Sequence, residues 1–372
     1  MEEALEIYIH VPFCVRKCAY CDFYSHPADR ASRDAYFDML SEEISLSPYT
    51  GRGVSSVFFG GGTPSAVEAE EIRRIMDQLK REFKLLPGAE VSIEVNPGTV
   101  TKEKLSAYRE AGFNRLSLGL QSADDKMLEK LGRIHDFRTF SDTFHAARDA
   151  GFTNISLDLI SGLPGQTPEG FEESLKKALS FQPEHLSVYS LIIEENTPFY
   201  RLYGPEGTEA YDLPDEDSER ETAHLTDRLL LAAGYEKYEI SNYARPGFQC
   251  RHNLGYWTGV PYLGFGAAAA SYIDGKRFRN AMNDKYLELP YEECEVLTES
   301  DRMAEMMILG LRLTEGVRFD AFRERFGKDL KEVYGDVLRK YASLGALEIE
   351  KDRVRLTAYG MDTANIVMAA FL

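Results

Sequence analysis

The sequence lacks the features that would place it in a membrane or on a nucleic acid. No run of apolar residues approaches the roughly 18 that a membrane-spanning helix needs, and the acidic start Met1-Glu2-Glu3 is unlike a secretory signal peptide. Lysine and arginine number 43 against 61 aspartate and glutamate residues, for a formal net charge of −18. Because phosphate neutralisation requires clustered basic residues, we expect no nucleic-acid partner, no transmembrane segment and a cytoplasmic location.

Cysteine is also scarce, but three of the five cysteines stand close together, at Cys14, Cys18 and Cys21, in the spacing CxxxCxxC. No second ligand pair of the kind that zinc sites use accompanies them, since Cys250 and Cys294 are distant in sequence. Thiolates bind iron–sulfur clusters, and three of them leave one iron of a [4Fe-4S] cluster open to a further ligand. We therefore favour such a cluster, in a reducing compartment, over a zinc site or three unliganded thiols.

Short apolar runs rich in β-branched residues alternate with amphipathic stretches from the start of the chain. The runs predict strands at Ile7–Phe13, Val54–Phe59, Val91–Val95, Arg115–Leu120, Ile155–Ile160 and His185–Ile192. The stretches between them predict helices at Arg33–Ser47, Val67–Phe83, Lys102–Ala111, Phe137–Ala150 and Pro168–Ser180. This repetition is typical of a parallel sheet with right-handed crossovers, and six units predict an α/β fold of the partial, TIM-like (β/α)6 barrel type.

Polar and glycine-rich segments follow five of these predicted strands, where the active sites of α/β barrels lie. They are Cys14, then Gly60–Pro64, then Glu94, Asn96 and Pro97, then Gln121 and Ser122, and finally Asp158 with Gly162–Gly165. Because the carboxyl ends of parallel strands meet at one rim, the sequence predicts a functional site there.

The pattern changes in the later part of the chain, which we divide into a barrel at 1–240, a connecting segment at 241–297 and a C-terminal domain at 298–372. A helix is predicted at Glu219–Ala233 and a short strand at Tyr238–Ser241. The small-residue run Gly264–Ala270 allows backbones to approach closely, either over a flat ligand or within a tightly packed strand.

The C-terminal domain is predicted to be helical and winged-helix-like. Helices are expected at Glu299–Leu313, Asp320–Phe326 and Leu330–Leu344, followed by a hairpin of Leu347–Glu350 with Val354–Leu356 and a last helix. Between Glu315 and Leu356 there are 10 basic and 9 acidic residues, so no basic surface is expected. We interpret the domain as a packing or partner module rather than a DNA-binding one.

The cysteine motif and its neighbours resemble those of the radical S-adenosylmethionine (SAM) superfamily, and more narrowly of the oxygen-independent coproporphyrinogen III oxidase branch. The resemblance covers nearly the whole chain. The matching segments follow in order: Tyr8–Cys21, Gly60–Pro64, Glu94–Pro97, Leu118–Ser122 and Asp158–Pro164. It implies a [4Fe-4S] cluster and SAM as cofactors, and an electron donor for the cluster.

Within that branch, two features resemble a heme-chaperone subgroup rather than the oxidase. The oxidase carries a fourth cysteine two residues after the third, where this chain has Phe23. The subgroup has a motif HNxxYW, present here at His252–Trp257. The resemblance therefore implies heme binding and transfer to acceptor proteins, including peripheral contact with membrane-bound acceptors. The alternatives are a true oxidase that decarboxylates coproporphyrinogen III and an RNA-modifying radical SAM enzyme, so enzymatic activity stays open.

The resemblance also implies individual site residues. Cofactor contacts fall on Tyr8, Tyr20, Gly61, Gly62, Thr63, Glu94, Gln121, Arg133 and Asp158. For heme we predict His252 as the axial ligand and Cys250 as a weaker candidate, since haem iron accepts His and Cys axially. The alternative is that His252 hydrogen-bonds within a structural loop.

Overall fold

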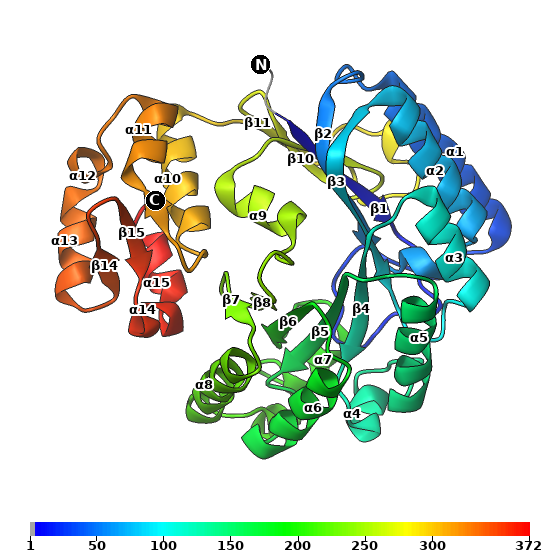
Figure 1. The fold of residues 1–372 in the computed structure, drawn as a ribbon, viewed down its shortest axis with the longest axis horizontal. Coiled ribbons are helices and arrows are strands. Elements are labelled where there is room, and N and C mark those ends of the chain that lie inside the picture. Colours follow the sequence, from blue (N-terminus) through cyan, green and yellow to red (C-terminus); the bar gives the residue numbers. More distant parts are fainter. Residues whose placement is uncertain (1–3) are drawn as a thin grey trace.

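The computed structural model describes residues 4–372, and its larger part is one curved, mixed sheet (Figure 1). Six parallel strands stand side by side in chain order: β1 (Leu5–Val11), β2 (Gly53–Gly61), β3 (Lys84–Val95), β4 (Arg115–Gln121), β5 (Ile155–Ser161) and β6 (His185–Ser190). The helices between them are α1 (Arg30–Leu46), α2 (Ala69–Glu82), α3 (Lys102–Ala111), α4 (Asp125–Lys130), α5 (Phe137–Asp149) and α6 (Pro168–Ser180). The predicted α/β fold with a partial barrel is confirmed.

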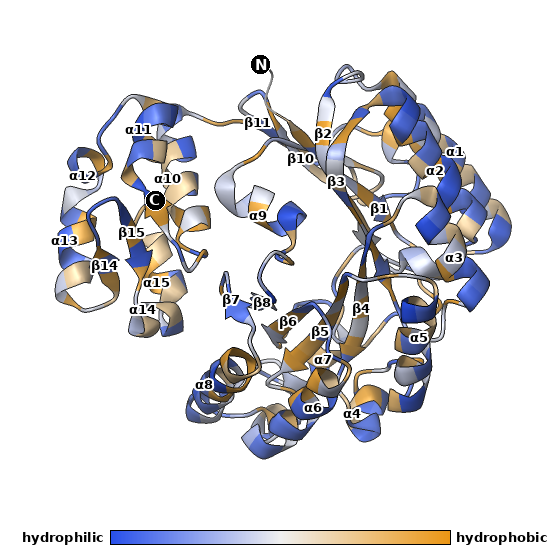
Figure 2. Cartoon of the chain, viewed as in Figure 1, coloured by the Kyte–Doolittle hydropathy of each residue, from blue (hydrophilic) through white to orange (hydrophobic). Residues whose placement is uncertain are grey.

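Local sequence explains where these helices begin and end. Asp29, Thr101 and Thr167 are N-cap residues whose side chains accept backbone N–H groups of the first turn, at α1, α3 and α6 respectively. Gly112 ends α3 in the left-handed conformation, with φ of 102°, which glycine adopts without strain. Figure 2 shows the outer helices polar on their exposed faces and the strands largely hydrophobic. The core therefore lies between the sheet and its outer layer of helices.

Both edges of the sheet are extended by short strands that follow α7 (Pro198–Tyr203) and α8 (Glu216–Ala232). Beside β6 lie β8 (Asn242–Ala244) and then β7 (Glu236–Lys237). Beside β1 lie, in order, β9 (Tyr262–Phe265), β10 (Ala270–Ile273), β11 (Lys276–Arg279) and β12 (Glu293–Val296). The segment that sequence suggested as a connection thus supplies five strands, while the domain boundaries themselves stay predictions.

Two local predictions from this region change. The strand expected at Tyr238–Ser241 is wrong, because these residues form the turn between β7 and β8, with only an isolated bridge from Glu239 to Leu313. The run Gly264–Ala270 is split between the end of β9, a turn and the start of β10. Close backbone approach is confirmed there, since a Cβ on Gly264 would lie 2.2 Å from the carbonyl oxygen of Ala270.

The C-terminal domain contains the predicted helices and hairpin (Figure 1). Its helices are α10 (Glu299–Gly310), α11 (Phe319–Phe326), α12 (Leu330–Val333), α13 (Gly335–Ser343), α14 (Ala358–Asp362) and α15 (Ala364–Ala369). The strands β14 (Leu347–Ile349), β15 (Arg353–Leu356) and β13 (Val317–Arg318) form a three-stranded antiparallel sheet. The single helix expected at Leu330–Leu344 is interrupted at Tyr334, where φ and ψ are −116° and 17°. Among residues 4–372, no helix is both long and apolar enough to cross a membrane.

One further helix lies on the concave side of the large sheet. This helix, α9 (Arg251–Thr258), runs between the sheet and the C-terminal domain and contacts α10 and β2 (Figure 1). It contains the HNxxYW motif, so the motif is helical rather than the loop considered for it from the sequence.

Candidate functional site

The register of the parallel strands brings the predicted site residues to one rim. Val11 at the end of β1 pairs with Gly61 at the end of β2, and Gly119 of β4 pairs with Asp158 of β5. A bulge between Gly119 and Gln121, with Gln121 at φ of 65°, ends β4 and turns its chain. All the cofactor-contact residues expected from the sequence line one cavity of about 490 Å3, together with the three clustered cysteines.

The cysteine loop is fixed by backbone hydrogen bonds to distant segments. Cys14 N–H donates to the carbonyl of His26, and Ala19 N–H donates to that of Leu131, at 3.1 and 3.0 Å. The Cys14 Sγ lies 3.4 Å from Thr63 Oγ1, and Arg133 donates to Cys18 Sγ at 3.6 Å. The loop therefore presents its thiols to the cavity beside a hydroxyl and a cationic side chain.

The chemistry of this donor set fits an iron–sulfur cluster. All three thiols are free and partly buried, and burial raises the pKa of Cys21 to about 11, with Cys18 and Cys14 close enough to raise it further. Within residues 4–372, no three His, Cys, Asp or Glu side chains converge tightly enough to hold a single metal ion. Three separate corners of a [4Fe-4S] cluster impose a wider spacing than a single ion does, and bound iron would take the thiols as thiolates.

Two glycines let the end of β2 approach the cysteine loop and His10 closely. A Cβ on Gly62 would lie 2.9 Å from the carbonyl oxygen of Phe13 and 3.1 Å from Cys14 Sγ. Gly61 has φ of 110°, and a Cβ there would lie 2.7 Å from the ring of His10. No larger residue fits at either position without a shift of its neighbours, so the end of β2 packs directly on His10 and on the cysteine loop.

Two buried acids lie on the same wall of the cavity. Burial, reinforced by the nearby Asp158, raises the pKa of Glu94 to about 8, although the backbone N–H of Gly61 opposes this shift. Burial also raises the pKa of Asp158, while hydroxyls of Ser187 and Ser117 oppose it; Ser117 donates to both carboxylate oxygens at 3.2 and 3.0 Å. Both acids can accept hydrogen bonds from ligand hydroxyl or ammonium groups.

Arg133 is held at the cavity by a residue that the sequence analysis did not assign a role. Its Nη2 donates to Asn96 Oδ1 and, at 3.0 Å, to the carbonyl of Gly119. Asn96 in turn donates from Nδ2 to Thr63 Oγ1 at 2.8 Å. Asn96 therefore ties Thr63 to Arg133, and its position at the end of β3 was the available signal.

The two tyrosines expected at the cofactor come from different segments, Tyr8 from β1 and Tyr20 from the cysteine loop itself. Tyr8 Oη lies 3.2 Å from His10 Nδ1, and its ring stacks on Phe58 with centroids 6.4 Å apart. The ring of Tyr20 packs on Phe199, with a centroid separation of 6.3 Å. Both tyrosines contribute to the cavity wall.

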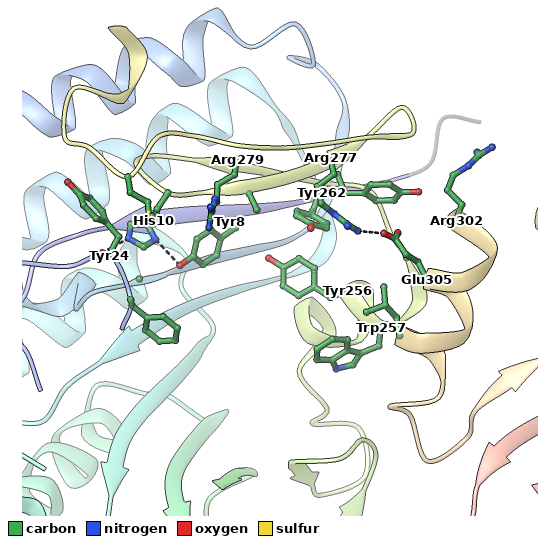
Figure 3. Close-up of a pocket in the computed structure, with 18 of the residues that line it drawn as sticks. Tyr8, His10, Tyr24, Tyr256, Trp257, Tyr262, Arg277, Arg279, Arg302 and Glu305 are labelled. Atoms are coloured by element: carbon green, nitrogen blue, oxygen red, sulfur yellow. Dashed lines mark hydrogen bonds and ion pairs between the residues drawn. The ribbon is translucent and has the colours of Figure 1, made fainter. Parts of the chain in front are cut away.

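A second cavity of about 600 Å3 adjoins the first and was not anticipated from the sequence (Figure 3). It lies between the concave side of the sheet, α9 and α10. Its aromatic lining consists of Tyr8, Phe23, Tyr24, Tyr256, Trp257, Tyr262 and Tyr272, and its arginines are Arg277, Arg279, Arg302 and Arg325. The two cavities share Tyr8, Asp22, Phe23, Gly61, Glu94 and Tyr256.

Two of these arginines project from β11. Figure 3 shows Arg277 paired with Glu305 of α10, whereas Arg279 pairs with Glu293 of β12 at 2.7 Å. Their alternate positions on one strand place both on the same face. The alternating basic and aromatic residues of Arg277-Phe278-Arg279 were the sequence signal that could have found them.

His252 is buried on α9 and engaged on both ring nitrogens. Nδ1 lies 2.8 Å from Ser56 Oγ, and Nε2 lies 3.0 Å from Tyr256 Oη. Burial lowers its pKa to about 3, so the ring is neutral. Cys250 is fully buried next to Glu90, and burial raises its thiol pKa to about 12. His252 as a heme ligand stays a prediction, and ligation would require the bond to Tyr256 or to Ser56 to break.

Two parts of the chain match known protein families. Residues 8–178 match the radical SAM superfamily and residues 297–362 match the HemN C-terminal domain. The chain is 40% identical to the heme chaperone HemW of Bacillus subtilis (strain 168), covering 98% of both chains. It is 34% identical to the heme chaperone HemW of Escherichia coli (strain K12), covering 99% of this chain and 98% of that one.

The solved structures add a similarity of fold. Coproporphyrinogen III oxidase (HemN) from Escherichia coli, described as a radical SAM enzyme, superposes with a TM-score of 0.86 at 27% identity, covering 100% of this chain and 90% of that chain. Sequence identity to the heme chaperones is higher and extends over nearly the full length. The chain therefore belongs to the radical SAM superfamily and, within it, to the heme chaperone HemW family.

Proposed function

We propose that this protein is a cytoplasmic heme chaperone, which binds heme in the cavity between the sheet, α9 and α10 and passes it to acceptor proteins. The observation that carries the proposal is the composition of that cavity, an aromatic chamber with four arginines in a chain whose net charge is −18. A flat apolar macrocycle with two carboxylates is complementary to such a chamber, because aromatic rings pack on its faces and arginine pairs with carboxylate. The cavity volume of about 600 Å3 lies within the range of small-molecule sites.

The propionates are assigned to Arg277 and Arg279. Both guanidinium groups reach the cavity, and both are paired with glutamates that carboxylates of a ligand can replace. An exchange of one carboxylate for another costs less than burying an unpaired charge. We therefore assign binding of the heme carboxylates to this strand.

The cysteine site is assigned to a [4Fe-4S] cluster on Cys14, Cys18 and Cys21, with SAM at the glycine strand end. When bound, these groups supply one-electron chemistry that the protein orients and shields from water. Gly61 and Gly62 line the cavity without side chains, while Glu94, Asp158, Gln121 and Arg133 offer hydrogen-bond partners to the ligand. An electron donor for the cluster and the heme-accepting proteins, soluble or membrane-bound, are the partners that this function requires.

A titration of the anaerobically reconstituted protein with hemin tests the proposal. We expect saturation at one heme per chain, and a weakening of roughly ten-fold for each of Arg277→Ala and Arg279→Ala. Arg318→Ala, an exposed arginine of the C-terminal domain paired with Asp320, is the matched control and should bind as the wild type does. The absence of saturable binding, or equal effects of all three substitutions, would contradict the assignment.

The alternative function is that of an oxygen-independent coproporphyrinogen III oxidase, favoured by the structural similarity to that enzyme. Against it stands Phe23, which occupies the place of the oxidase's fourth cysteine and has an exposed fraction of 63%. Incubation of reduced protein with SAM and coproporphyrinogen III, followed by analysis for vinyl products, distinguishes the two functions. Vinyl products would establish the oxidase, and their absence together with heme binding would establish the chaperone.

A further inference from the structure

Several side chains that can ligate haem iron line the cavity proposed for heme, and most of them are engaged elsewhere. His10 has both ring nitrogens bonded, to Tyr8 Oη at 3.2 Å and to the carbonyl of Tyr24 at 2.9 Å. Tyr24 donates its hydroxyl to Asp284 at 2.9 Å. These residues would have to give up existing partners before they could bind iron.

Tyr256 is placed differently. It stands on the cavity face of α9, lines both cavities, and points into the space between Tyr8 and Tyr262 (Figure 3). Its hydroxyl is bonded to Nε2 of His252, which does not itself line the larger cavity. The histidine of the motif therefore reaches that cavity only through the tyrosine.

Behind His252 a chain of polar groups continues into the interior. His252 Nδ1 meets Ser56 Oγ at 2.8 Å, and Glu6 Oε2 lies 3.8 Å from the same nitrogen. Glu6 is buried, and this oxygen has no hydrogen-bond partner among the described residues. Burial raises the pKa of Glu6 to about 8, so its carboxyl is neutral beside the neutral imidazole ring.

We propose that Tyr256 is the axial ligand of ferric heme in this protein and that His252 is a positioning residue that acts through it. The inference rests on the proposed heme-binding function and specifies its iron ligand. Tyrosine is an established type of axial ligand of haem iron. Burial raises the pKa of the free Tyr256 phenol, so the bond to Fe(III) itself has to stabilise the phenolate, and the ring of His252 positions its oxygen through the existing hydrogen bond.

Binding of ferric heme by Tyr256 requires its hydroxyl group to lose a proton. The O–H bond of Tyr256 breaks and its proton goes to the hydroxide ligand that hemin carries in solution, which becomes water. An oxygen lone pair forms the bond to Fe(III), and the ligand that hemin carries in solution leaves. The iron stays ferric, so no electron donor takes part. His252 and Glu6 stay neutral, and the phenolate offsets the positive charge of the ferric porphyrin.

Spectroscopy of the hemin-loaded, reconstituted protein tests the inference independently of any transfer activity. Phenolate bound to ferric iron gives a charge-transfer band and iron–phenolate vibrations in the resonance Raman spectrum. We expect Tyr256→Phe to abolish both signals and to weaken hemin binding roughly ten-fold. Tyr262→Phe, whose ring lies 4.7 Å from that of Tyr256 in the same cavity, is the matched control and should keep both signals.

The histidine variants separate the two roles. His252→Ala should keep the phenolate signals with shifted frequencies and weaker hemin binding, and His252→Asn should restore part of the affinity through a new hydrogen bond to Tyr256. If His252→Ala removes the iron ligand while Tyr256→Phe keeps the wild-type spectrum, the inference is overturned and His252 is the ligand. The same holds for Tyr8 if only Tyr8→Phe removes the phenolate signals. If the wild type binds no hemin at all, the proposed function itself fails.

Discussion

At the residue scale, three glutamates of the barrel have raised pKa values. Burial raises the pKa of Glu6 and of Glu94 to about 8 each, and that of Glu43 to about 7. Glu43 is fully bonded, to the backbone N–H of Gly266, to Asn280 and to the hydroxyl of Tyr286. Glu6 lacks a partner at Oε2, so its burial is the least compensated of the three.

These raised pKa values predict how stability depends on pH. The folded protein retains a proton on Glu6 that the unfolded chain releases above about pH 4.5, so folding stability is full below that pH and falls as pH rises towards about 8. Glu6→Gln should therefore flatten the dependence of the unfolding free energy on pH, measured by urea denaturation from about pH 5 to 8. Glu110→Gln, on the exposed surface of α3, is the control and should leave the slope unchanged. Equal slopes in wild type and Glu6→Gln would contradict the predicted contribution.

At the scale of the element, α9 depends on one glycine for its place inside the barrel. A Cβ on Gly255 would lie 2.1 Å from Oε1 of Glu6, so the helix rests directly against the side chain of β1. The spacing of the motif is thereby explained in part, because His252 and Tyr256 flank this contact on the same helix. A bulkier residue at position 255 would displace both of them from β2 and from the cavity.

We accordingly expect Gly255→Ala to lower the unfolding free energy by about 1–3 kcal/mol through overpacking. Glu6→Ala in the same chain should recover part of this loss, because it removes the atoms that the new Cβ meets. Gly170→Ala is the matched control, since a Cβ there would have its nearest contact at 3.6 Å on the exposed side of α6 and the change should be neutral or stabilising. Additive effects of Gly255→Ala and Glu6→Ala would show that the two residues do not compete for space.

At the scale of the whole molecule, polar contacts attach the C-terminal domain to the sheet and to α9 across the larger cavity. Arg277 of β11 pairs with Glu305 of α10, and Arg325 of α11 donates to the carbonyl oxygens at the end of α9. The guanidinium of Arg312 lies 4.4 Å from the ring centre of Trp257. The wall of the larger cavity is thus built from two parts of the chain: the sheet with α9, and the C-terminal domain.

The pair of Arg277 with Glu305 therefore predicts a measurable opening. Glu305→Gln should increase backbone hydrogen exchange in α9 and α10 by up to about five-fold, the effect expected from a partly exposed ion pair worth about 1 kcal/mol. Glu293→Gln removes one of the two glutamates, Glu292 and Glu293, that pair with Arg279 and is the matched control, for which exchange in these helices should not change. Faster exchange in both variants, or in neither, would argue against a role of this pair in closing the cavity.

The sequence alone determined the alternation of strands and helices, because buried parallel strands are short apolar runs and their covering helices are amphipathic. It also determined the cysteine motif, the glycines at the end of β2 and the acids at the strand ends, because these residue types mark a backbone constraint or a chemical role by themselves. Short elements could not be predicted from the sequence. Strands β9 to β12 have four residues each and α9 has eight, which is too short to show a reliable hydrophobic periodicity.

Only the tertiary structure decided which of these residues share a cavity. Arg277 forms an ion pair with Glu305 and lines the same cavity as Arg279 and Tyr256. These residues come from segments far apart in the chain, and no local pattern encodes their proximity. Likewise, His252 stood out as a potential ligand in the sequence, yet the packing of α9 against β1 and β2 turns its ring towards Ser56 and leaves Tyr256 facing the cavity. Side-chain identity is local, whereas exposure and partners depend on how distant elements pack.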